Sequence, residues 1–474
     1  MTSPATRAGC RRCLFLRLWP LSRGSGFYLI EMANPSPEIP GIRTRPEPPA
    51  YSAARTLLGL TLFAAPLPYG AVYTWAWASL TILTLLVLIL WMVGSIQEGR
   101  LRIGYSPLYV PVALMLALGW IQLWFHLTLT PIATKESLLK LATDFALFFV
   151  VIQLFWASSP ETWRRVGVAV LAFGFIFSFL SILQFFWNPG RIFWVGRYLG
   201  GPFGPYVDRD HYAGLMEMVA PVSAAYVLSR PKRDPLNGML WFAVLVPVVS
   251  LLLTGSRGGF VSGLGEVAIL GWILIWRNPL PGRRRRVAAT GLALVAVAAV
   301  FFWLVPTYVL TKLGTIGNYV PEASGGNRPT LWKNSLGIFR DHPLVGAGMG
   351  SFVTAYPPHQ TEVSDLVTEH AHNDYVEALT ETGLVGGVLI LAALVLFVRI
   401  IFRNLDVQLK YEPGWIQMGA AIACCGLLIH SFVDFNLHIP ANAAWFAFCA
   451  GLASLSGRII PQRGATTAAE RFNA

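Results

Sequence analysis

The sequence predicts an all-α polytopic membrane protein with about twelve membrane-spanning helices. Of its 474 residues, 55% are hydrophobic and only 13% are charged, whereas soluble domains carry roughly a quarter charged residues. The mean hydropathy is +0.55, and several separate stretches approach the roughly 18 to 20 apolar residues that cross a bilayer. The lipid bilayer is therefore the expected solvent for most of the chain.

The apolar stretches divide the chain into a long membrane domain and two short tails. We expect a disordered basic tail at residues 1–52, a transmembrane domain at 53–457 and a C-terminal tail at 458–474. The first tail lacks the apolar core and cleavage site of a signal peptide, and Met32 is an alternative candidate for the first residue. The expected spans are residues 53–70, 72–95, 107–126, 138–157, 165–187, 211–229, 238–254, 259–276, 287–310, 374–398, 414–432 and 441–457.

The placement of positive charge predicts the orientation of these spans. The formal net charge is +12, which in a soluble protein would suggest a nucleic-acid partner. With both termini in the cytoplasm, however, all but ten of the 36 lysines and arginines fall on the cytoplasmic side, as the positive-inside rule requires. The four arginines at 283–286 are then topology determinants, and no nucleic-acid partner is expected.

The ten exceptions indicate where function lies, because they oppose the topological bias. Arg257 is the strongest of them, since the turn at 254–259 (TGSRGG) places its guanidinium at the membrane boundary between two apolar helices, where an ionisable group is costly. Neighbouring glycines and a helix start at about residue 259 favour anion binding, although an arginine reaching for lipid phosphate is the simpler alternative. The ten are Lys135, Lys140, Arg191, Arg197, Arg209, Arg257, Lys312, Arg328, Lys333 and Arg340.

Two outer segments, 188–210 and 311–373, are long enough to build a site. The second contains turn residues around a short predicted helix at 330–340, so we expect an ordered periplasmic cap between the ninth and tenth spans. Arg328 lies just ahead of that helix, where it would hold phosphate oxygens. His372 ends the cap at the mouth of the bundle, and a neutral imidazole there would accept a proton. We therefore expect His372, Arg257 and Arg328 to be the catalytic residues.

Other polar residues of the same segments are candidates for binding the substrate. A metal site is the alternative for two pairs, His370 with His372 and Asp208 with Asp210, but Arg209 between the two aspartates would repel a cation. We expect neither a metal nor a cofactor, and the Cys10–Cys13 spacing lacks the second pair of a zinc site. The candidate substrate-binding residues are Arg191, Arg197, Arg209, His211, His370, Asn373 and Asp374.

Several motifs together resemble the O-antigen ligase and polymerase superfamily. They are residues 256–259 (SRGG), Arg328 with Leu331 and Trp332, 342–350 (HPLVGAGMG), 372–375 (HNDY) and 381–386 (ETGLVG). The resemblance implies a GT-C-like bundle of twelve helices, with His372 as the catalytic base and Arg257 and Arg328 gripping the donor diphosphate. Residues 208–214 (DRDHYAG) match a segment in which relatives commonly carry Asn at the first and third positions, so Asp208 and Asp210 are a departure.

The resemblance implies an inverting glycosyltransferase of the bacterial inner membrane with its active site on the periplasmic face. The expected donor is a glycan on undecaprenyl diphosphate, and the expected acceptor is a sugar hydroxyl of lipid A-core, as for an O-antigen ligase. A polymerase, whose acceptor is another lipid-linked glycan, is the first alternative. A non-catalytic transporter of lipid-linked glycan is the second, but the sequence lacks the paired broken helices of two similar halves.

Overall fold

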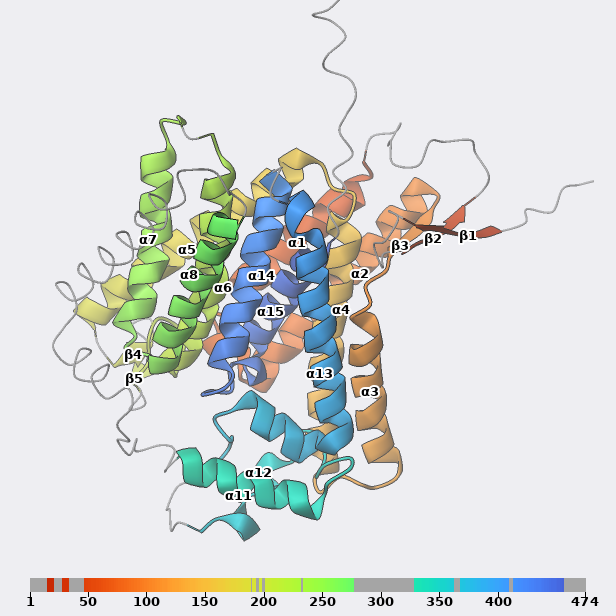
Figure 1. The fold of residues 1–474 in the computed structure, drawn as a ribbon, viewed down its shortest axis with the longest axis vertical. Helices are drawn as coiled ribbons and strands as arrows, with labels where there is room; N and C mark the ends of the chain where they lie inside the picture. Colours follow the sequence, from red (N-terminus) through yellow and green to blue (C-terminus); the bar gives the residue numbers. More distant parts are fainter. Residues whose placement is uncertain are drawn as a thin grey trace, which may run out of the picture.

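The computed structural model shows a bundle of helices with a smaller helical cap at one end (Figure 1). It describes residues 15–20, 28–33, 47–188, 190–192, 196–197, 201–231, 233–276, 328–361, 367–408 and 412–455. Within these residues every expected span coincides with a helix, and the ninth span, 287–310, lies outside them. The helices are α1 (Pro49–Ala64), α2 (Thr74–Glu98), α3 (Tyr109–Trp124), α4 (Pro131–Phe155), α5 (Pro160–Trp187), α6 (Arg209–Ser229), α7 (Asn237–Leu253), α8 (Arg257–Trp276), α13 (Asp374–Gln408), α14 (Glu412–His430) and α15 (Pro440–Ala453).

The outer helices expose apolar side chains, as a bilayer requires. On α13 the residues Leu384, Val388, Leu391, Val395 and Val398 recur every three or four positions and are about half exposed, so they form one continuous apolar face. Six of the described helices, α2, α4, α5, α8, α13 and α14, are long and apolar enough to cross a membrane. The chain is thus an all-α polytopic membrane protein.

Helices α6, α14 and α15 form the centre of the bundle (Figure 1). Small residues let their backbones approach closely, as is usual between membrane helices. A Cβ atom on Gly419 of α14 would lie 2.6 Å from the Cβ of Ala225 and 2.8 Å from the carbonyl oxygen of Pro221, both on α6. Trp445 of α15 is fully buried and donates from Nε1 to the carbonyl of Leu62 in α1, at 2.9 Å. The centre is therefore tightly packed and supports the loops at its ends.

Helix α13 is broken at Gly383, and the break joins the bundle to the cap. Gly383 has φ 63° and ψ −163°, a conformation that only glycine adopts without strain. The residues before the break lie in the cap, and those after it run up the side of the bundle (Figure 1). The sequence analysis expected one continuous helix over 374–398, so the break corrects that expectation.

The cap consists of α11 (Arg328–Asp341), α12 (Phe352–Ala355) and a short 3-10 helix, η2 (Pro357–His359). It has its own small core, formed by Leu331, Ile338, Ala347, Phe352, Ala355, Tyr356 and Ala371. The helix expected at 330–340 is therefore present as α11. Residues 277–327, which include the first part of the expected cap, lie outside the described residues.

The glycine-rich motif 342–350 supports the break in α13. The amides of Leu384 and Val385 donate to the carbonyls of Pro343 and Leu344, at 2.9 and 3.1 Å. The side chain of Gln122 on α3 donates to the carbonyl oxygens of Val345 and Glu381, at 2.6 and 2.8 Å. Because a helix break leaves backbone groups without helical partners, the motif provides the partners that the broken helix lacks.

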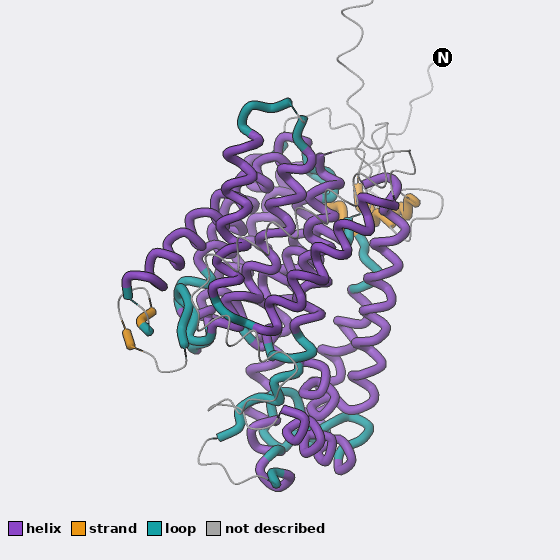
Figure 2. Tube along the Cα trace, turned by 60° about the vertical axis from the view of Figure 1, so that its left-hand side comes forward, coloured by secondary structure: helices purple, strands orange, loops and turns teal. Residues whose placement is uncertain are grey.

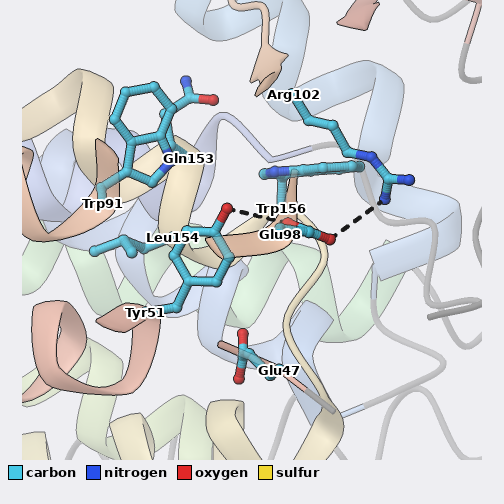
Figure 3. A pocket seen from close by; sticks show the side chains of 8 residues that line it. All are labelled: Glu47, Tyr51, Trp91, Glu98, Arg102, Gln153, Leu154 and Trp156. Atoms are coloured by element: carbon cyan, nitrogen blue, oxygen red, sulfur yellow. Dashed lines mark hydrogen bonds and ion pairs between the residues drawn. The ribbon is translucent and has the colours of Figure 1, made fainter. Parts of the chain in front are cut away.

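The described strands are short and lie at the edges of the bundle. In a three-stranded antiparallel sheet, β2 (Tyr28–Ala33) pairs with both β1 (Phe15–Pro20) and β3 (Leu101–Gly104). The first two contrast with the disorder expected for residues 1–52. Because β1 pairs with β2 and β2 pairs with β3, both of their backbones have hydrogen-bond partners. Beside β3, Tyr51 of α1 donates to Glu98 of α2 at 3.1 Å in a small polar pocket (Figure 3). The sheet of β1, β2 and β3 lies at the end of the bundle away from the cap (Figures 1 and 2).

Candidate active site at the junction of bundle and cap

His372 lies in the tight turn that leads into α13. Its backbone has φ 47°, which is uncommon outside glycine and found at functional sites. The flanking residues fix this turn: Trp332 of α11 donates from Nε1 to the carbonyl of Ala371, at 3.0 Å. On the other side Asn373 caps α13, since its Oδ1 accepts from the amides of Tyr375 and Val376, both at 3.0 Å. The imidazole is therefore held between the cap and the bundle.

Asp434 is the partner of His372. Its Oδ1 lies 3.3 Å from His372 Nδ1, and His211 Nε2 lies 3.8 Å from its other oxygen. Burial alone would raise the pKa of Asp434, but the neighbouring histidines His211, His372 and His430 outweigh burial and hold the pKa well below its usual range. The ionised carboxylate orients the imidazole so that Nε2 points away from it. The sequence analysis did not select Asp434.

Arg328 reaches the same loop, which connects α14 to α15. Its guanidinium donates from Nη1 to the carbonyl oxygen of Val433, at 2.6 Å. Since Val433 precedes Asp434, Arg328 binds the backbone of the loop whose carboxylate lies against His372. Arg328 and His372 therefore both contact neighbouring residues of this loop.

Arg257 is the first residue of α8, whose first turn packs against this loop. A Cβ atom on Gly258 would lie 2.4 Å from His430 Nε2 and 2.9 Å from Val433 Cγ2. Only a glycine therefore lets α8 begin so close to the loop. The helix start that carries Arg257 thus packs on the residue whose carbonyl Arg328 binds.

A buried ion pair supports the start of α8. His430 Nδ1 lies 2.8 Å from Glu217 Oε1, and both side chains are almost fully buried. Gly259 packs against the same carboxylate, because a Cβ atom there would lie 3.2 Å from Glu217 Oε1. Charged groups in the membrane are costly and mark functional sites, but the sequence analysis overlooked this pair because neither residue stands in a recognisable motif.

The first turn of α6 carries two of the candidate substrate-binding residues. The ring of His211 contacts Phe435 edge-on, with centroids 4.7 Å apart. Arg209 folds over Gly201, where a Cβ atom would lie 3.0 Å from its Nη1. His211 therefore belongs to the group of side chains around Asp434. Arg209 instead lies against the loop that contains Gly201.

Asp208 caps α6 at the same place. Its Oδ1 accepts from the amide of Asp210, at 2.8 Å. Burial, followed by the charge of Asp210, raises the pKa of Asp208 to about 6, although His211 works in the opposite direction. Asp208 is therefore the N-cap of α6, and its side chain binds the backbone amide of Asp210.

Arg191 and Arg197 are not part of this group. Their backbones lie opposite each other in the antiparallel hairpin of β4 (Arg191–Ile192) and β5 (Gly196–Arg197). The hairpin lies at the edge of the bundle, away from α13 (Figure 1). The carbonyl of Arg191 accepts from the side chain of Gln184. Of the three arginines expected in the first outer segment, only Arg209 lies on α6 beside His211.

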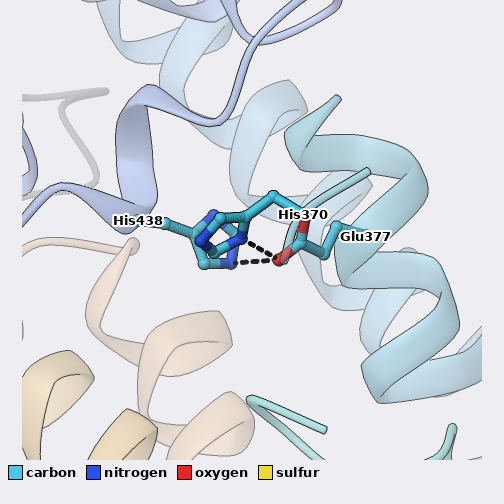
Figure 4. Close-up of side chains that lie close together, drawn as sticks. All are labelled: His370, Glu377 and His438. Carbon is cyan, nitrogen blue, oxygen red and sulfur yellow. Dashed lines mark hydrogen bonds and ion pairs between the residues drawn. The ribbon is translucent and has the colours of Figure 1, made fainter. Parts of the chain in front are cut away.

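His370 and Asp374 belong to a second cluster, which flanks His372. His370 Nδ1 lies 2.7 Å from Glu377 Oε1, and His438 Nε2 lies 3.3 Å from the same oxygen (Figure 4). His438 Nδ1 lies 2.8 Å from Asp374 Oδ1. Burial would lower the pKa of His438, but Glu377 and Asp374 outweigh it and raise the pKa to about 10. The ring of Phe435 separates the clusters, with His370 stacked on it at 4.0 Å and His372 edge-on at 5.0 Å.

A comparison with known families found one match. Residues 242–391, about a third of the chain, are similar to the family described as O-antigen ligase. The matched segment contains Arg257, Arg328 and His372, whereas Asp434 lies beyond it. No curated protein matches the chain.

Proposed function

We propose that this O-antigen ligase homologue is an inverting glycosyltransferase that moves a glycan from undecaprenyl diphosphate to a sugar hydroxyl. The expected acceptor is lipid A-core, and the proposed location is the periplasmic face of the bacterial inner membrane. One observation carries the proposal: His372, Arg328 and the start of α8 meet around Val433 and Asp434. Two positive charges and one imidazole are the groups that this reaction requires.

The two arginines would stabilise the leaving diphosphate. Breaking the bond between the anomeric carbon and the phosphate oxygen leaves negative charge on the diphosphate. A guanidinium binds phosphate oxygens with two parallel hydrogen bonds and keeps its charge. At the start of α8 the positive end of the helix dipole would add to the charge of Arg257 in attracting the diphosphate. These charges provide the neutralisation that a divalent ion provides in other transferases.

His372 would remove the proton of the acceptor. With Nδ1 turned to Asp434, Nε2 is the nitrogen that faces the acceptor hydroxyl and takes its proton. The acceptor oxygen then bonds to the anomeric carbon from the side opposite the diphosphate, so the configuration at that carbon inverts. Asp434 stabilises the imidazolium that forms.

Incubation of the purified protein with a defined undecaprenyl-diphosphate glycan and both candidate acceptors tests the function. Formation of glycosylated lipid A-core supports a ligase, whereas a longer lipid-linked glycan indicates a polymerase. If neither product forms and the donor is only moved across vesicles, the protein is a transporter and the proposal is wrong.

The base assignment is tested with His372→Ala. A general base contributes about 10²- to 10⁴-fold, so transfer should fall by that factor while expression and membrane insertion stay unchanged. The matched control is His359→Ala, because His359 lies in the same cap and pairs with Asp341 at 3.2 Å, away from Asp434. Transfer at the wild-type rate by His372→Ala would rule out this role.

A further inference from the structure

Three side chains converge beside the proposed active site without a part in the transfer. They are His370, Glu377 and His438, and one nitrogen or oxygen atom of each lies within 4.8 Å of the corresponding atoms of the other two (Figure 4). In a tetrahedral zinc site with bonds of about 2.0 to 2.2 Å, neighbouring ligand atoms lie roughly 3.3 to 3.6 Å apart. The 3.3 Å between His438 Nε2 and Glu377 Oε1 matches that separation, and the 2.7 Å between His370 Nδ1 and the same oxygen needs only a small opening.

The remaining polar atoms of two of these residues are already held in place. Glu377 Oε2 accepts from the amide of Ala371, at 2.8 Å, which leaves Oε1 facing the two imidazoles. His438 Nδ1 lies 2.8 Å from Asp374 Oδ1, which leaves Nε2 facing Glu377. A carboxylate that orients a histidine from behind is the usual outer partner of a metal-bound imidazole.

From this geometry we propose that His370, Glu377 and His438 form a binding site for a divalent cation of the zinc class. Two imidazole nitrogens and one carboxylate oxygen suit zinc or its neighbours rather than magnesium or calcium, which prefer oxygen ligands. His370 and His438 are about 30% exposed, at 27% and 31%, so a water molecule can supply a fourth ligand. The site differs from both metal pairs that the sequence suggested.

Such a cation would fasten the loop after α14 to the start of α13. His438 follows Phe435 in this loop, in η3 (Asn436–His438), and Phe435 contacts His372. His370 and Glu377 lie on either side of His372 in the sequence. The cation would therefore hold the two segments that carry His372 and Asp434, at a distance from the reacting atoms. This role is independent of the transfer reaction.

The test measures bound metal rather than transfer. The full chain, purified with a histidine-free tag and carrying Cys10→Ser and Cys13→Ser, is loaded with zinc, dialysed and analysed for metal content. We expect about one zinc ion per chain, and His438→Ala or His370→Ala should remove it. Asp374→Asn keeps the three ligands and should weaken zinc binding by about 10- to 100-fold. His359→Ala is the matched control and should retain the zinc.

Cobalt binding to the unaltered chain provides a measurement that does not depend on a variant folding. Tetrahedral Co²⁺ with nitrogen and oxygen ligands gives characteristic visible absorption bands, which zinc should abolish by competition. A chain that retains no zinc and gives no cobalt bands overturns the proposal. Equal zinc retention by the His438→Ala and His359→Ala variants also overturns it. Either result leaves the proposed transferase function untouched.

Discussion

Asp208 illustrates how a single carboxyl group at the site affects stability. Its pKa of about 6 is higher than the usual value of about 3.9, so the folded chain disfavours its ionised form. Above about pH 6 the folded protein bears the cost of this buried charge. The cost shrinks as the pH falls and disappears below about pH 4, where the carboxyl is protonated in both the folded and the unfolded chain.

Asp208→Asn should therefore stabilise the protein at neutral pH. The amide oxygen of Asn can still accept from the amide of Asp210 and keep the helix cap, but it carries no charge. We expect a gain of about 1 to 3 kcal/mol at pH 7.5, derived from the pKa shift, and a much smaller gain at pH 4.5. Thermal unfolding of the detergent-solubilised protein at both pH values measures it.

Asp341→Asn is the control for this comparison, since Asp341 is 61% exposed and its replacement should change little at either pH. An equal gain from Asp208→Asn at both pH values would contradict the assignment of the cost to ionisation.

Single residues whose charge opposes the positive-inside rule could be identified from the sequence. The residues that hold the site together, such as Asp434, could not. Arg328 was identifiable because it lies on the outer side, next to a helix start. Asp434 was not, because it lies 62 residues beyond His372 and a lone aspartate between two apolar helices forms no motif. Its role follows only from the packing of α14 against α6, α8 and the turn before α13.

Among the helices, the break in α13 depends on a single residue, Gly383. A Cβ atom on Gly383 would lie 2.5 Å from both the carbonyl carbon and oxygen of Leu344 and 2.6 Å from the amide nitrogen of Gly346. These neighbours are backbone atoms that cannot rotate away. The backbone of residues 344–346 can therefore lie this close to the break only because residue 383 has no side chain.

Gly383→Ala should destabilise the junction between bundle and cap by at least about 1 to 3 kcal/mol, the cost of a strained backbone conformation, with the clash in addition. Gly263→Ala in α8 is the control, because a Cβ atom there has no neighbour within 4 Å and alanine favours a helix. Limited proteolysis of the cap and thermal unfolding measure both variants. If the two variants are equally stable, the break at Gly383 is not required.

Hydropathy predicted the helices well, because a membrane span is defined by its length and apolar content. It did not predict the break, since glycines are common in membrane helices. Only the contact with residues 343–346, which lie in a different part of the chain, distinguishes Gly383 from Gly387 on the same helix. The strands β1 and β2 were missed for a similar reason, because β3, the outer partner of β2, is far along the sequence.

For the whole molecule, the distribution of charge predicts which end faces the cytoplasm. The start of α5 carries Arg164 and Arg165, both exposed, at one end of the bundle. The cap lies at the other end (Figure 1). The positive-inside rule then predicts that the cap faces the periplasm, where the proposed donor and acceptor would meet.

Single cysteines test this orientation. In a chain whose native cysteines are replaced, Val367→Cys in the cap should react with a membrane-impermeant maleimide in spheroplasts, since Val367 is 72% exposed. Glu161→Cys, at a position that is 54% exposed, should react only after the membrane is permeabilised. Labelling of Glu161→Cys in intact spheroplasts, without labelling of Val367→Cys, would reverse the orientation and place the site in the cytoplasm.

The loop between α14 and α15 has a consequence for biosynthesis. Val433 accepts the hydrogen bond of Arg328, and Asp434 faces His372, yet the ribosome makes both residues after every segment that matches the family. A nascent chain released before this loop would carry the arginines and the imidazole without the groups that bring them together. Helices α14 and α15, which flank this loop, would therefore complete the proposed site, and we expect the growing chain to remain inactive until both have entered the membrane.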